Sequence, residues 1–114
     1  MQPEPSRAER IAARRGEVLQ QLGQADAQLA ELRSMRAGIS DDDEHDPDGV
    51  SLSSEWSRLE GLRQTQLEAL AAIDEAAARL ERGEDTTCSV CGRPIAPARL
   101  EARPDATTCI DCAR

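Results

Sequence analysis

Four cysteines in two Cys-x-x-Cys pairs constrain this chain of 114 residues more than any other feature. The pairs are Cys88 with Cys91 and Cys109 with Cys112, with 17 residues between them. Four thiolates at this spacing can form a tetrahedron around one zinc ion. Because the chain has no other cysteine, the pattern predicts one closed structural zinc site with these four residues as ligands.

The alternative for the same four residues is a pair of disulfides, which small secreted proteins often use. The first 16 residues contain four arginines and no apolar run of signal-peptide length. No stretch approaches the ~18 apolar residues that a membrane span requires. We therefore expect a cytoplasmic protein, in which a cysteine quartet binds metal. Gly92 directly follows the first cysteine pair. The chain often turns after a Cys-x-x-Cys pair with a left-handed backbone, which glycine adopts freely.

The composition favours long helices over a globular core. Trp56 is the only aromatic residue, and alanine and leucine dominate the apolar side chains. The formal net charge is -8, which disfavours direct binding to the polyanions DNA and RNA. We expect a protein partner, and neither a nucleic acid nor a membrane.

The N-terminal half predicts one long helix after a flexible segment at residues 1–5. Ser6 and Glu9 form the pattern of a capping box. Apolar residues then recur at three- and four-residue spacing, which places them on one stripe: Ile11, Val18, Leu22, Ala25, Leu29 and Leu32. Arg15 and Arg36 interrupt that stripe.

A polar segment separates this helix from a second one. Residues 41–49 contain six carboxylates, a proline and a glycine but no apolar residue, so we expect an acidic loop at residues 39–51. A second helix is predicted to begin near Ser51 or Ser54 and to end at Gly83. Its apolar stripe consists of Leu52, Trp56, Leu59, Leu70, Ile73, Ala77 and Leu80, widened by Leu62 and Leu67.

The predicted fold class is mainly α. A long antiparallel coiled-coil hairpin (residues 6–84) precedes a small four-cysteine zinc-finger module (residues 85–114). At 1.5 Å per residue, helices of about 30 residues extend ~45 Å. We therefore expect the acidic loop at one end of the hairpin and the zinc at the other. Four thiolates leave no open position on the metal, and the chain lacks a nucleophile–base pair or a phosphate loop, so we expect no enzyme and no catalytic residue.

The C-terminal motifs closely resemble those of the DksA/TraR family of C4 zinc-finger proteins. The resemblance rests on Cys-Ser-Val-Cys-Gly-Arg-Pro-Ile from Cys88, on Arg-Leu-Glu-Ala-Arg-Pro from Arg99 and on Cys-Ile-Asp-Cys from Cys109. It implies a regulator of transcription that binds bacterial RNA polymerase. The resemblance further implies that the hairpin enters the secondary channel and that aspartates at its tip approach the catalytic Mg²⁺.

The family's tip pattern, Asp-x-x-Asp-x-Ala, fits this chain only partly. Counted back from Cys88 without gaps, its second aspartate falls on Asp48 and its alanine on Val50. An alternative alignment uses Asp43 and Asp46, followed by Asp48. These three aspartates are the predicted partner-binding residues of the tip.

Some members of the family also bind guanosine tetraphosphate. Arg103 matches their arginine, but the two lysine positions are occupied by Ala72 and Ala113, so we do not expect alarmone binding at that site. The alternative to a polymerase regulator is a zinc-ribbon adaptor that binds another protein. In this alternative the charges of the acidic loop only keep the turn between the helices in contact with water. Binding of DNA or RNA through the finger is the weakest hypothesis.

Overall fold

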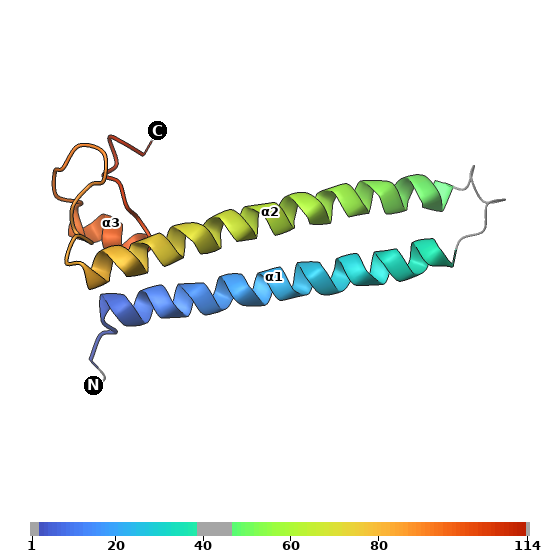
Figure 1. Cartoon of the computed structure of the whole chain (residues 1–114), viewed down its shortest axis with the longest axis horizontal. Coiled ribbons are helices and arrows are strands. Elements are labelled where there is room, and N and C mark those ends of the chain that lie inside the picture. The colour runs from blue at the N-terminus through green and yellow to red at the C-terminus, as the bar shows by residue number, and fades with distance from the viewer. Residues whose placement is uncertain (1–2, 39–46, 114) are drawn as a thin grey trace. The chain divides into compact units, whose positions relative to one another are not determined.

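The computed structural model describes residues 3–38 and 47–113, and the fold is mainly α-helical. Its elements are α1 (Arg7–Ala37), α2 (Pro47–Glu81) and the short α3 (Pro97–Ala102). The long helices α1 and α2 contact one another as an antiparallel pair, and the four cysteines follow α2 (Figure 1). The predicted hairpin and four-cysteine module are thus confirmed.

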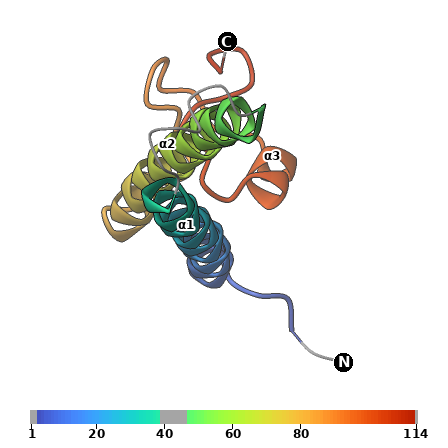
Figure 2. The ribbon, with the colours of Figure 1, turned by 90° about the vertical axis from the view of Figure 1, so that its right-hand side faces the viewer.

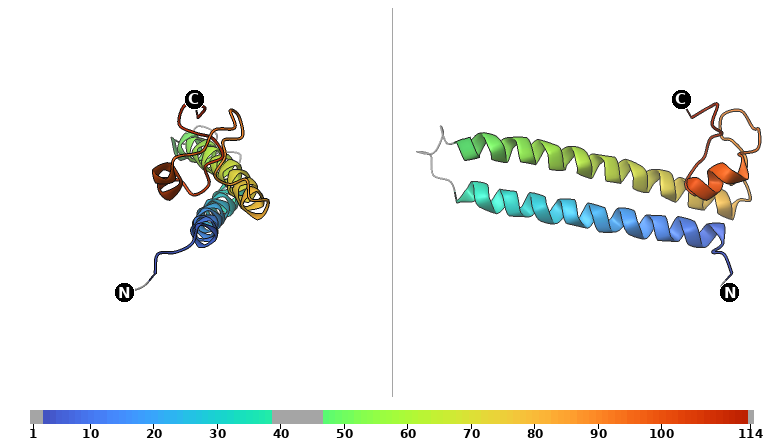
Figure 3. Two further views of the ribbon diagram at one scale, coloured as in Figure 1. Left: turned by 90° about the vertical axis from the view of Figure 1, so that its left-hand side faces the viewer. Right: turned by 180° about the vertical axis from the view of Figure 1, so that it is seen from behind.

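The chain divides into two compact units. The basal unit combines Met1–Val18 with Ala69–Arg114, and the distal unit is Leu19–Glu68. Both units contain a segment of α1 beside a segment of α2. The basal unit also contains all four cysteines and α3, whose flanking loops lie alongside the ends of the two long helices (Figures 2 and 3).

Helix α1 begins where the capping box predicts. The Ser6 hydroxyl oxygen accepts a hydrogen bond of 3.1 Å from the backbone N–H of Glu9. This bond satisfies one of the amide groups that have no partner inside the first turn of a helix. Ser6 is therefore the N-cap residue, and the sequence alone located the start of the helix correctly.

Helix α2 begins earlier than the sequence suggested. It starts at Pro47, whereas we expected a loop over 39–51 and a start near Ser51 or Ser54. Proline is well suited to the first turn of a helix, because its fixed φ is helical and its missing N–H needs no partner there. The predicted tip residues Asp43 and Asp46 lie outside the residues that the structure describes.

Helix α2 ends as predicted. Gly83 has a φ of 74°, in the left-handed region that favours glycine. The backbone N–H of Gly83 bonds the carbonyl of Leu80 at 3.1 Å, and that of Glu84 bonds the carbonyl of Arg79 at 2.9 Å. These bonds satisfy the last free carbonyls of the helix.

The core of the distal unit is small. Leu59, Leu29 and Leu32 are buried against one another, and Leu52 and Trp56 pack on this cluster. All five belong to the predicted stripes, so Trp56 fills the seam between the helices.

Charged residues surround this seam. The Arg63 guanidinium bonds the Asp26 carboxylate at 2.7 Å across the two helices. Arg33 and Arg36 both lie over the Trp56 ring, at 5.7 and 5.5 Å from its centroid. Arg36, which interrupts the predicted stripe, thus contacts the seam at its edge.

The helical core of the basal unit contains Ile11, Val18, Ile73 and Ala76. Val18 and Ile73 are completely buried. Arg15 interrupts the stripe at the surface, where its Nε donates a hydrogen bond of 2.9 Å to Asp74. Among the described residues, no helix is both long and apolar enough to span a bilayer.

Candidate metal centre

The four cysteines converge in space. Their sulfur atoms all lie within 4.8 Å of one another, and those of Cys91 and Cys109 are 3.7 Å apart. A zinc ion bound tetrahedrally at 2.3 Å from each sulfur requires a sulfur–sulfur separation of about 3.8 Å. This is the only such cluster of metal-ligating side chains in the part of the chain that the structure describes. The four residues therefore fit one tetrahedral metal ion.

The first pair lies in a tight hairpin turn. The backbone N–H of Cys88 bonds the carbonyl of Arg93 at 2.8 Å, and that of Gly92 bonds the carbonyl of Cys88 at 3.1 Å. Gly92 has a φ of 76°, which confirms the left-handed turn predicted there. Just outside the turn, Thr87 and Pro94 form a single antiparallel bridge.

Backbone contacts hold the second pair next to the first. The N–H of Ser89, between the first two cysteines, bonds the carbonyl of Thr107 at 2.9 Å. The Arg99 side chain on α3 donates a further bond of 2.9 Å to the carbonyl of Thr108. The chain just before Cys109 is thus fixed both to the first pair and to α3.

The environment of the thiols favours a cation among them. Backbone N–H groups lower the pKa of Cys88 to about 6, the largest effect coming from the N–H of Cys91. In contrast, the pKa of Cys112 is raised to about 12, chiefly because its thiol hydrogen-bonds Cys109. Four thiolates this close would repel one another strongly, and a divalent cation offsets that repulsion.

A small apolar core supports the cysteines. Cys88, Ile95 and Leu100 are buried together, with Ala106, Cys109 and Cys112 packed against them. Ile95 follows the first pair, and Leu100 lies on α3. The α3 helix therefore contributes its one buried side chain to the core that carries the metal ligands.

Arg79 is a structural residue that sequence reasoning missed. Only 8% of it is exposed, and its Nη2 donates to the carbonyl of Glu84 at 2.8 Å and to the carbonyl of Thr87. Thr87 immediately precedes Cys88, so Arg79 joins the end of α2 to the first cysteine pair. Nothing in the sequence distinguishes this arginine from those that remain at the surface.

Arg7 forms a second connection, from the start of α1. Its Nη2 donates a bond of 3.1 Å to the carbonyl of Pro104, after α3. Its Nε lies 3.5 Å from the Asp85 carboxylate. Partial burial lowers the pKa of the Arg7 guanidinium, and the nearby Asp85 opposes this effect. The start of α1 and the end of α2 are therefore both attached to the module that carries the cysteines.

Of the three predicted tip residues, only Asp48 lies within the described residues. Asp43 and Asp46 are outside the described residues, and Asp48 belongs to the first turn of α2. The structure thus brings together all four predicted metal ligands, while the three aspartates stay predictions.

The fold and the sulfur cluster define a class of protein: a helical hairpin followed by a C4 zinc finger. Residues 78–114 match the family model of the prokaryotic dksA/traR C4-type zinc finger. The match lies in the part of the chain where the cysteine motifs indicated this family.

The similar proteins are DksA proteins. The chain is 43% identical over 61 residues to two proteins of Caulobacter vibrioides, each named RNA polymerase-binding transcription factor DksA. Each match covers 52% of this chain and 43% of the relative. The matched part therefore spans less than half the length of each relative. Both relatives are transcription factors, in agreement with the prediction of a protein that is not an enzyme.

The structure is also similar to that of transcription factor DksA2 from Pseudomonas aeruginosa. The TM-score is 0.77 at 28% sequence identity, and the match covers 92% of this chain and 75% of the other. The likeness therefore includes the helices as well as the finger.

Proposed function

We propose that Cys88, Cys91, Cys109 and Cys112 bind one Zn²⁺ ion and that this ion is structural. The support is the distance between the sulfur atoms, which fits the size of a tetrahedral zinc–thiolate centre. With four protein ligands the ion has no free position for water or substrate, so it stabilises the fold and carries out no reaction.

The protein as a whole is proposed to be a DksA-like regulator that binds bacterial RNA polymerase in the cytoplasm. The observation that carries this proposal is the similarity to DksA2 over 92% of the chain. The match of 52% of the chain to proteins named RNA polymerase-binding also supports it. The partner is a protein, consistent with the net charge of -8.

In this proposal the acidic segment between α1 and α2 acts inside the polymerase. The hairpin inserts into the secondary channel, and Asp43, Asp46 and Asp48 approach the catalytic Mg²⁺ region. Carboxylates can ligate Mg²⁺ or pair with basic side chains of the polymerase. Alarmone binding is not part of the proposal, because alanines occupy positions 72 and 113.

The test separates binding from the action of the tip. The zinc-loaded chain is expected to be retained by immobilised core RNA polymerase and to change the lifetime of promoter complexes. The double variant Asp46→Asn, Asp48→Asn should lose most of the effect on lifetime. The control is Glu60→Gln, which alters an exposed carboxylate of α2 and should behave as the unaltered chain. If the unaltered chain is not retained, the proposal is wrong.

The adaptor function is the second candidate, and one observation favours it. Val90 and Ile110, one in each cysteine pair, are 70% and 71% exposed. These two side chains are available for apolar contacts with another protein. An adaptor should keep its binding when the acidic segment is replaced by a neutral one of equal length.

A further inference from the structure

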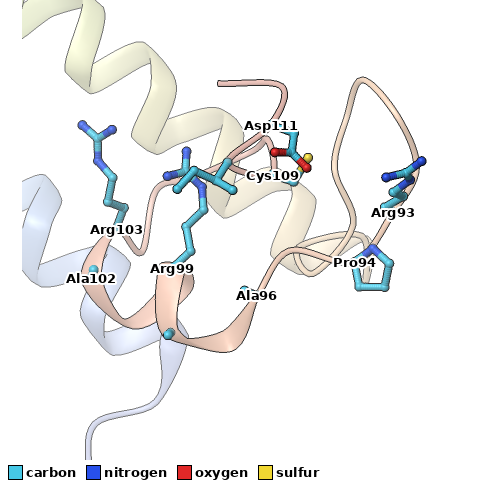
Figure 4. A pocket seen from close by; sticks show the side chains of 10 residues that line it. Arg93, Pro94, Ala96, Arg99, Ala102, Arg103, Cys109 and Asp111 are labelled. Atoms are coloured by element: carbon cyan, nitrogen blue, oxygen red, sulfur yellow. The ribbon is translucent and has the colours of Figure 1, made fainter. Parts of the chain in front are cut away.

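A groove in the zinc-finger module is not explained by metal binding. It lies between α3 and the second cysteine pair and encloses about 580 Å³. We call it the α3 groove; its walls include Pro94, Ala98, Ala102 and Ile110 (Figure 4). All of these residues belong to the basal unit. They are also exposed, so no other part of the described chain covers them.

The floor of the groove is apolar and made of small residues. Ala98 and Ala102 are four residues apart and share one face of α3. Ile110 stands beside it with 71% of its surface exposed, although its position between two metal ligands does not require an apolar residue. An apolar side chain of a partner would cover both the alanine face of α3 and the side chain of Ile110.

The rim of the groove is basic. Arg93, Arg99 and Arg103 line it together with one carboxylate, that of Asp111. This local excess of positive charge occurs in a chain whose net charge is -8. Figure 4 shows Arg93 and Arg103 on opposite sides of Arg99, so the three guanidinium groups are spread along the groove.

This arrangement suits a peptide better than a small anion. The Nε of Arg99 already donates to the carbonyl of Thr108, and Arg93 and Arg103 lie on opposite sides of Arg99 instead of converging on one point (Figure 4). Separated cations along an apolar floor instead match a segment with one apolar side chain between carboxylates. We propose that the α3 groove binds an acidic segment of a protein partner, with one bulky apolar residue of that segment placed over Ala98, Ala102 and Ile110.

The proposal does not depend on which protein supplies the segment, so it can be tested without polymerase. The probe is a fluorescein-labelled, end-blocked peptide with one central phenylalanine flanked by glutamates. Its binding to the zinc-loaded full chain is measured by fluorescence anisotropy at low and moderate salt. We expect saturable binding that weakens with salt, since the rim charges are exposed.

Two variants with matched controls locate the site. Ile110→Ser should weaken binding about tenfold, because it removes one apolar side chain from the contact. Its control is Val90→Ser, which alters the equally exposed aliphatic residue of the other cysteine pair, outside the groove. Arg93→Glu should also weaken binding about tenfold. Its control is Arg58→Glu on α2, outside the basal unit. Bound zinc and far-UV circular dichroism establish that each variant is folded.

Several outcomes would overturn the proposal. They are the absence of binding up to millimolar peptide, equal losses in the variants and their controls, or equal binding of a peptide with lysines in place of the glutamates. The same variants, assayed for retention by core RNA polymerase, reveal whether the polymerase supplies such a segment. If the variants bind the peptide weakly but are retained by the polymerase as well as the unaltered chain is, the polymerase does not supply the segment. The peptide result would still hold.

Discussion

The two units of the molecule are stabilised in different ways. In the part of the chain that the structure describes, the distal unit has one small core around Leu29, Leu32 and Leu59, together with surface charge pairs. The described residues of the basal unit form two apolar cores, and this unit also contains the sulfur cluster and the buried guanidinium of Arg79. The same pair of helices thus includes a region held by apolar side chains and a region that also has the four-cysteine cluster and buried polar contacts. This difference predicts which changes will affect each unit.

The largest effect should come from the metal ligands. Cys91→Ser removes one of four sulfurs, and structural zinc contributes on the order of 10 kcal/mol to the folding of small zinc modules. We expect the variant to lose zinc and the amide protection of residues 86–112. Protection around Leu59 in the distal unit should remain. Zinc content and hydrogen exchange measure the two results, and a loss of protection that is uniform over both units would contradict the comparison.

The next largest effect should be confined to the distal unit. Leu59 is 1% exposed. It belongs to the only core cluster that the described residues of the distal unit form. Leu59→Ala should lower the free energy of unfolding by about 2–4 kcal/mol, because it leaves a cavity between the helices. Denaturant unfolding of the zinc-loaded chain measures the loss. The control is Leu62→Ala, since Leu62 is 38% exposed and its truncation should cost much less.

A smaller effect should arise at the connection between α2 and the finger. Arg79→Met retains most of the side-chain volume but leaves the carbonyls of Glu84 and Thr87 without their donor. The expected loss is about 1–3 kcal/mol, the usual cost of unsatisfied buried polar groups. Thermal unfolding of the zinc-loaded chain measures it, together with the rate of zinc release to a chelator. Arg82→Met, at an exposed position that pairs with Glu75 and Glu84, should leave both quantities nearly unchanged.

The smallest effect should come from the surface pair in the distal unit. The side chains of Asp26 and Arg63 are 51% and 39% exposed, so water and salt screen their interaction. A double-mutant cycle with Asp26→Ala and Arg63→Ala should give a coupling energy below about 1 kcal/mol. A larger coupling would mean that surface charges contribute more to the distal unit than its leucine core suggests.

Most of the helical architecture could be predicted from local patterns. The Ser6 cap, the left-handed glycines at positions 83 and 92, and the apolar stripes all follow from chain geometry over a few residues. The start of α2 was predicted too late. A polar, acidic segment with Pro47 and Gly49 resembles a loop, yet proline is compatible with the first turn of a helix.

The amino-acid sequence by itself determined the hairpin and the four-cysteine set and indicated the family of the finger, because periodicity and ligand spacing are properties of short segments. Only the tertiary structure decided which arginines are buried and that an apolar groove forms beside α3. These features depend on carbonyl groups and side chains that meet across large separations in the chain. The 14 arginines are chemically alike in the sequence, and Arg79 differs from the others only through the backbone that surrounds it.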